Sequence, residues 1–205
     1  MLSNLRIGDK FFQWLVKIDE ETSRRVAAGG CQFCGGALHR GDYPRKPREG
    51  LLAAVGEVFS RRISLCCGRR GCRRRATPPS VRFLGRRVYL GLVVVLASVL
   101  LCTAAAQQVR RTAARDVRRA TGIPSRTLSR WGEWWQTEFP RSRLFEEQRG
   151  RFMPPLSIDS LPVSLWERFE HAGRDEAEVL VRTLVFLSPL TTGSVASGAR
   201  FVRVD

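Results

Sequence analysis

The sequence predicts a mainly α-helical protein with a small β unit, an α+β fold class. Two glycine-flanked cysteine pairs about thirty residues apart indicate a zinc ribbon. A stretch of 21 residues without charge, followed by two amphipathic segments, indicates a long buried helix and then a helix-turn-helix. We expect four parts: an N-terminal amphipathic helix in 1–30, a zinc ribbon in 31–87, the apolar helix and helix-turn-helix in 88–139, and a helical extension with a loose tail in 140–205.

Positive charge is concentrated in the first two thirds of the chain. Residues 1–130 carry 26 Lys and Arg against 8 Asp and Glu, whereas residues 131–205 carry 9 against 11. Between Val58 and Arg115 there are 13 arginines and no acidic residue, so this region cannot neutralise itself by internal ion pairs. We expect it to bind an anionic partner, with nucleic acid the first candidate and a membrane surface the second.

The N-terminal segment predicts an amphipathic helix over residues 9–28, because apolar side chains recur at helical spacing until Gly29 and Gly30 end the pattern. The chain begins with MLSNLRIGDK, which has no apolar stretch behind its charge and is therefore not a secretory signal. Six cysteines in such a chain favour a reducing, cytoplasmic compartment in which thiols serve metal binding or catalysis.

The two cysteine pairs predict one structural Zn²⁺. Cys31 and Cys34, in CQFCGG, have the spacing at which a tight turn presents two sulfur ligands of a tetrahedral site. Cys67 and Cys72, in CCGRRGC, form a wider second pair. We expect each pair to lie on a hairpin, with turn amides stabilising the thiolates.

The remaining cysteines and histidines have other expected roles. Adjacent strand residues point to opposite faces, so Cys66 and Cys67 can hardly bind the same ion; we choose Cys67, and Cys66 stays the alternative. Cys66 is then expected to be a small core residue, Cys102 a packed thiol and His39 a solvated side chain. A catalytic thiol is the other interpretation of the cluster, but only His39 and His171 are available as its base, and we expect no enzyme activity.

The apolar stretch over 88–108 has two interpretations. Its length is sufficient to span a bilayer. Polar residues dilute it, however, and arginines flank both ends equally, so no positive-inside asymmetry orients it. A fully buried helix in a small domain gives the same pattern, and we prefer that interpretation.

The segment TAARDVRRATGIPSRTLSRW predicts two helices, the first closed by Gly122 and the second N-capped by Ser125. Leu128, Trp131 and Trp135 share one inward face. A solvated basic helical hairpin is the alternative to a DNA-reading helix-turn-helix. The predicted DNA-binding residues are Arg115, Arg118, Ser125, Arg126, Thr127, Ser129 and Arg130, with Arg73, Arg74 and Arg75 of the second cysteine loop on phosphates.

Residues 140–155 contain three prolines and read as a linker. Two nearly neutral helices follow, in VSLWERFEHA and DEAEVLVRTLVFL. Their apolar side chains are expected to pack on the apolar helix or to bind a partner protein.

The order of CxFCGG, CCGRRGCRRR and RRATGIPSRTLSRW, over roughly residues 31–135, resembles the N-terminal DNA-binding half of insertion-sequence transposases with a zinc ribbon. The resemblance implies Cys31, Cys34, Cys67 and Cys72 as zinc ligands and Ser125 to Arg130 as recognition residues. Such transposases continue into an RNase-H-like domain whose carboxylates hold two metal ions, and about 70 residues after Trp135 are too few for it.

We therefore expect a double-stranded-DNA-binding accessory or regulatory protein of a mobile element, without its own nuclease. Two alternatives remain at this point. The first is a small membrane-anchored protein with a cytoplasmic zinc ribbon. The second is a zinc-dependent protein-interaction module whose basic face is incidental.

Overall fold

The structure is a computed structural model that describes residues 8–45, 57–84, 91–103 and 107–192. The helices are α1 (Asp9–Ala28), α2 (Glu57–Ser60), α3 (Gly91–Thr103), α4 (Gln107–Thr121), α5 (Ser125–Thr137), α6 (Arg143–Gln148), α7 (Val163–Glu170) and α8 (Glu176–Leu187). The strands are β1 (Leu38–Arg40), β2 (Tyr43–Pro44), β3 (Arg61–Arg62), β4 (Leu65–Cys67) and β5 (Arg75–Ala76). Short 3₁₀ turns are η2 (Arg149–Arg151), η3 (Ile158–Ser160) and η4 (Ser188–Thr191). The predicted α+β class is confirmed.

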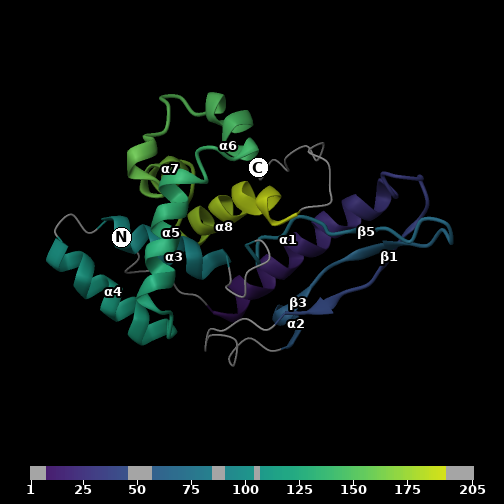
Figure 1. Ribbon diagram of the computed structural model, residues 1–205, viewed down its shortest axis with the longest axis horizontal. Coiled ribbons are helices and arrows are strands. Elements are labelled where there is room, and N and C mark those ends of the chain that lie inside the picture. Colours follow the sequence, from purple (N-terminus) through teal and green to yellow (C-terminus); the bar gives the residue numbers. More distant parts are fainter. Residues whose placement is uncertain (1–7, 46–56, 85–90, 104–106, 193–205) are drawn as a thin grey trace.

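The strands form two small antiparallel sheets. β1, β4 and β5 make a three-stranded sheet in that order, in which Leu38 pairs with Cys67 and Leu65 with Ala76. β2 and β3 make a separate pair. In Figure 1, β1 and β5 lie at one end of the long axis and α4 lies at the other.

Helix α1 has the bounds that the sequence predicts, and it contacts both the main hydrophobic core and the three-stranded sheet. Its buried apolar residues, Phe11, Phe12 and Leu15, belong to the main hydrophobic core. Its C-terminal part contacts β1, since Glu20 forms an ion pair with Arg40. Gly30 then turns the chain toward the sheet with φ +69, a conformation that favours glycine.

Helix α3 is a buried helix, as preferred from the sequence, over a shorter range than the apolar stretch. It packs against α4, α5, α7 and α8, and it buries side chains on nearly all sides, among them Val93, Val95 and Val99. Among the helices that the structure describes, none combines the length and the apolar content needed to cross a bilayer. Residues 104–106, inside the predicted apolar helix, lie outside the described residues.

One continuous hydrophobic cluster includes residues from all four predicted parts. The C-terminal helices pack on α3, which was one of their two expected roles. The prediction of a linker over 140–155 is wrong, because α6 and η2 lie there and Phe145 and Phe152 are buried. These rings continue an aromatic chain with Phe139 and Phe186, so the segment is part of the core. The predicted loose tail beyond residue 192 lies outside the described residues.

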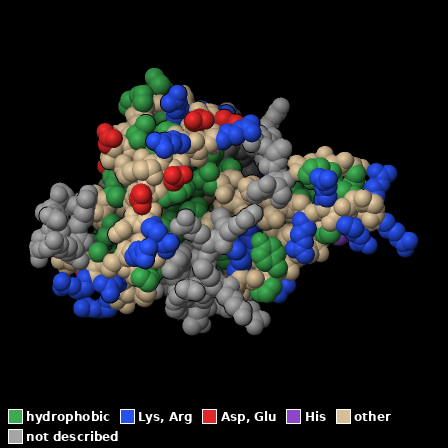
Figure 2. All heavy atoms as spheres, viewed as in Figure 1, with side chains coloured by type: hydrophobic (Ala, Val, Ile, Leu, Met, Phe, Trp, Pro, Cys, Tyr) green, Lys and Arg blue, Asp and Glu red, His purple; other side chains and the backbone are tan. Residues whose placement is uncertain are grey.

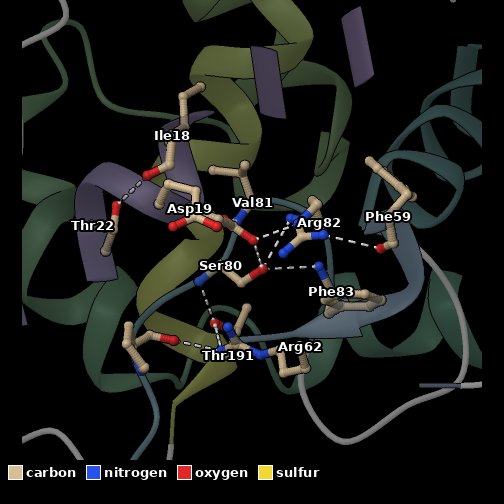
Figure 3. A network of polar contacts seen from close by, with 12 residues as sticks. Ile18, Asp19, Thr22, Phe59, Arg62, Ser80, Val81, Arg82, Phe83 and Thr191 are labelled. Carbon is tan, nitrogen blue, oxygen red and sulfur yellow. Dashed lines mark hydrogen bonds and ion pairs between the residues drawn. The ribbon is translucent and has the colours of Figure 1, made fainter. Parts of the chain in front are cut away.

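A buried polar network connects α1 to the segment that leaves the sheet (Figure 3). Asp19 of α1 is 1% exposed and forms an ion pair with Arg82, which is 2% exposed, at 2.7 Å. The same carboxylate accepts hydrogen bonds from the Ser80 hydroxyl at 2.6 Å and from the Val81 amide at 2.8 Å. Arg82 also donates to the carbonyl oxygen of Phe59. Both oxygens of a costly buried carboxylate are thereby engaged by this one segment.

A second buried arginine extends the network to the C-terminal helices. The guanidinium of Arg62 donates to the carbonyl oxygen of Pro78 and to the hydroxyl of Thr191, in η4. The Thr191 hydroxyl accepts a further bond from the Ser80 amide at 2.9 Å. Burial lowers the pKa of Arg62, and the nearby Asp19 carboxylate opposes that shift. The buried Arg62 side chain and the Thr191 hydroxyl thus connect the sheet region to η4, at the end of the C-terminal helices.

We predict that Asp19→Asn destabilises the protein by roughly 3–5 kcal/mol, because it leaves the Arg82 charge buried without its partner. The measurement is guanidinium-induced unfolding of the full chain. Glu21→Gln is the matched control on the same helix, since Glu21 forms only exposed ion pairs with Arg24 and Arg25 and should change stability by less than about 0.5 kcal/mol. Equal effects of the two substitutions would contradict the role given to Asp19.

Candidate metal centre and basic surface

The first cysteine pair lies on a turn that connects α1 to β1. The amide of Cys31 donates to the carbonyl oxygen of Gly36 at 2.9 Å, and the amides of Cys34 and Gly35 donate to the carbonyl oxygen of Cys31. Gly35 has φ +68. A Cβ at Gly36 would lie 3.1 Å from the Cys67 sulfur and 3.3 Å from the Cβ of Arg69, so a larger residue there would require the second cysteine loop to shift.

The second cysteine pair lies on the hairpin between β4 and β5. The amide of Cys67 donates to the carbonyl oxygen of Arg74 at 2.9 Å, and the amide of Cys72 donates to that of Arg69 at 3.0 Å. Arg73 has φ +48, which closes the wider loop without a glycine at that position. The expectation that both pairs lie on hairpins is therefore correct for this pair and wrong for the first.

The four predicted ligands converge on one point. The Sγ atoms of Cys31 and Cys72 are 3.7 Å apart, those of Cys34 and Cys67 are 3.5 Å apart, and all four lie within 4.8 Å of one another. Metal–sulfur bonds of about 2.3 Å in a tetrahedron require sulfur–sulfur distances of about 3.8 Å. The group therefore has the chemistry and the spacing to hold one tetrahedral metal ion.

The thiols differ in how readily they ionise. The Gly36 amide and the Cys67 thiol lower the pKa of Cys34 to about 7. The Arg69 amide favours the Cys67 thiolate, but burial and the neighbouring thiols outweigh it and raise the pKa of Cys67 to about 12. Four thiolates this close together repel one another, so a cation is needed to hold all of them ionised.

The other candidate ligands lie outside this cluster. The thiol of Cys66 contacts the carbonyl oxygen of Arg73 at 3.6 Å, so Cys67, and not Cys66, belongs to the group that could hold a metal. Cys66 is only half-buried, where a core residue was expected. His39 is exposed on β1, as expected, and Cys102 lies on α3, half-buried.

Exposed arginines surround the metal centre at the end of the molecule that carries β1 and β5 (Figure 2). The predicted Arg73, Arg74 and Arg75 are all exposed, and the neighbouring Arg69 and Arg70 are exposed too. Arg69 donates to the carbonyl oxygen of Cys34, across the two cysteine loops. Within the described part of the chain, none of the ion pairs involves these five side chains.

The second predicted basic surface is formed by α4 and α5. Gly122 has φ +69 and its amide bonds to the Arg118 carbonyl oxygen, so the predicted helix end is confirmed. The prediction that Ser125 is the N-cap of α5 is wrong. Pro124 takes that position, and no side chain caps the helix. The exposed predicted residues here are Arg115, Arg118, Ser125, Arg126, Ser129 and Arg130.

The prediction that Thr127 is a DNA-binding residue is wrong. Thr127 is 5% exposed, whereas we predicted an outward side chain. Thr127 lies four residues before Trp131 and eight before Trp135, so all three share the buried face of α5. Its hydroxyl accepts a hydrogen bond from Arg130, which places Thr127 behind the basic surface and not on it.

No family model, curated protein or solved structure matches this chain. The resemblance to transposases therefore stays a hypothesis.

We predict that Cys31→Ser and Cys72→Ser each abolish stoichiometric metal binding and destabilise the sheet, because a structural ion needs its four ligands. The measurement is metal content per chain by elemental analysis, with unfolding followed in parallel. Cys66→Ser is the matched control and should retain the metal, since its sulfur lies outside the cluster. Metal retained by Cys72→Ser, or lost from Cys66→Ser, would overturn the ligand assignment.

Proposed function

We propose that this protein is a zinc-stabilised binder of double-stranded DNA that acts as an accessory or regulatory factor of a mobile element, without a nuclease of its own. The observation that carries the proposal is the pair of exposed arginine clusters, on the cysteine loops and on α4 and α5, whose side chains have no acidic partner among the described ion pairs. Clustered cations of this kind attract the phosphate backbone.

The metal has a physical role in this proposal. The strands around it are two or three residues long, and the loops between them carry exposed arginines. Such a segment buries too little apolar surface to fold by that means alone. A zinc ion that joins Cys31, Cys34, Cys67 and Cys72 would hold both loops in place, and the arginines would then be presented to phosphates from a rigid support.

The start of α5 is suited to reading bases. Arg126 lies in its first turn, and Ser129 and Arg130 follow on the exposed face. Arginine can bind guanine O6 and N7 with two hydrogen bonds, and serine can meet a phosphate or a base. The buried Trp131 and Trp135 anchor the opposite face of the helix in the core, so the polar side chains keep a fixed orientation.

The two basic clusters lie toward opposite ends of the long axis (Figures 1 and 2). A duplex that contacts both would therefore run along the molecule. In that arrangement the arginines of the cysteine loops supply affinity and α5 supplies sequence preference. A partner protein would have to contact the exposed faces of the near-neutral C-terminal helices, because their apolar side chains pack in the core.

We predict tight binding of metal-loaded protein to a random-sequence duplex at low salt, with log affinity falling linearly with log salt concentration. Replacing Arg73, Arg74 and Arg75 together by Gln should weaken binding and reduce the slope by up to about 3 units, because each lost phosphate contact removes about 0.9. Fluorescence anisotropy of a labelled duplex across a salt series measures the affinity and its slope with salt. Arg149→Gln, a change of an exposed arginine in η2, is the control and should leave the slope unchanged. Absence of duplex binding at every salt concentration would end the proposal and favour an acidic protein partner.

The α5 surface gives a separate prediction. Arg126→Gln and Arg130→Gln should each relax the preferred base at one position, at a cost of roughly 1–3 kcal/mol on the best sequence. Selection of bound duplexes from a random pool, followed by sequencing, compares the variants with the parent protein. Arg141→Gln, an exposed arginine after α5, should select the parent's sequence. Unchanged selection by both α5 variants would show that this helix does not read the DNA.

A further inference from the structure

Phe33 is an exposed aromatic side chain at the tip of the first cysteine turn. It is 53% exposed, whereas most other aromatic rings of the described chain are buried or half-buried. The turn fixes its position, because the amides of Cys34 and Gly35 bond to the carbonyl oxygen of Cys31 on the other side of Phe33. The loop therefore holds the ring in a fixed, solvent-exposed position that a ligand can reach.

The surroundings of Phe33 are cationic. The guanidinium of Arg74, from the second cysteine loop, lies 4.1 Å from the centroid of the Phe33 ring. This contact covers one face of the ring, and the exposed fraction of Phe33 leaves surface beyond it open to a ligand. Arg69, Arg73 and Arg75 are exposed on the same hairpin. The metal cluster joins both loops, so ring and cations keep their relative positions.

We propose that Phe33 is a stacking platform for an unpaired DNA base, with Arg74 behind the ring and the neighbouring arginines on the flanking phosphates. The inference rests on the proposed DNA binding and refines its substrate class. Aromatic rings next to cations bind single-stranded segments by stacking, which every base permits. In an intact duplex the faces of the bases are covered by their neighbours, so a ring reaches one only by unstacking a base step, whereas an unpaired or flipped-out base offers its face without that cost.

The binding partner is therefore DNA with a locally unpaired segment. Arg69, Arg73 and Arg75 hold the phosphates on either side of the segment, which explains why an exposed ring and a dense set of arginines occur together. Stacking of a base on Phe33 would change the salt dependence of the DNA affinity very little, because stacking neutralises no charge. Stacking and phosphate binding can then be separated by experiment.

The experiment compares two DNAs of equal length and charge: a fully paired duplex, and the same duplex with a central run of mismatches. The full-length, metal-loaded protein should bind the mismatched duplex roughly tenfold more tightly. Phe33→Leu should lose this preference while keeping its affinity for the paired duplex, its salt slope and its metal content. Phe33→Tyr, which keeps an aromatic ring, should retain the preference.

Trp14→Leu is the matched control. Trp14 is another exposed aromatic side chain, 36% exposed on α1. It lies fourteen residues before Ala28, the last residue of α1, so about 21 Å of helix separates it from the start of the first cysteine turn. Its replacement should leave the preference for mismatched DNA intact. Photocrosslinking with 5-iodouracil in the mismatched run should also attach the DNA to the peptide that contains Phe33.

The outcomes separate this inference from the proposed function. Equal affinity of the parent protein for both DNAs, with a steep salt dependence, would overturn the stacking role and leave duplex binding intact. A preference that survives in Phe33→Leu would overturn it as well. If neither DNA is bound at any salt concentration, the proposed function fails, and the stacking role fails with it.

Discussion

The architecture depends on one buried ion pair, between Asp19 and Arg82. The region from Val58 to Arg115 contains no acidic residue, so an arginine that enters the core there can form an ion pair only with a carboxylate from elsewhere in the chain. Helix α1 supplies it through Asp19, which also accepts bonds from Ser80 and Val81. The segment that leaves the sheet is thereby held against α1, and Arg62 and Thr191 connect it to the C-terminal helices.

The cluster of four cysteines is the corresponding constraint beyond the C-terminal end of α1. The main core does not reach the cysteine loops, whose short strands bury little apolar surface. Four thiols from two loops converge there, and a bound ion would replace the missing core. The protein thus combines an ordinary hydrophobic core around α3 with a small unit that is joined to it by the polar network and by α1.

The arginines divide into two classes by their surroundings. Arg62 and Arg82 are buried and serve the fold, because both donate to carbonyl oxygens and Arg82 also forms an ion pair with Asp19. Exposed arginines form two clusters toward opposite ends: Arg69, Arg70, Arg73, Arg74 and Arg75 on the cysteine loops, and Arg115, Arg118, Arg126 and Arg130 on α4 and α5. Only the exposed class can supply the charge that the proposed DNA binding requires, so the total of 32 arginines overstates the binding surface.

The sequence by itself determined what local patterns control: the bounds of α1, the helix end at Gly122, the buried character of α3, and the choice of Cys31, Cys34, Cys67 and Cys72. Each follows from periodicity, a glycine conformation or ligand spacing, which act over a few residues. Tertiary structure alone decided the role of Asp19, the burial of Thr127, the ordered segment over 140–155 and the contact of Arg74 with Phe33. These depend on residues brought together from distant parts of the chain, for which one sequence carries no pairwise signal. The rule that charged residues stay exposed failed at Asp19, Arg62 and Arg82, because Asp19 and Arg82 form an ion pair and both arginines donate to carbonyl oxygens inside the fold.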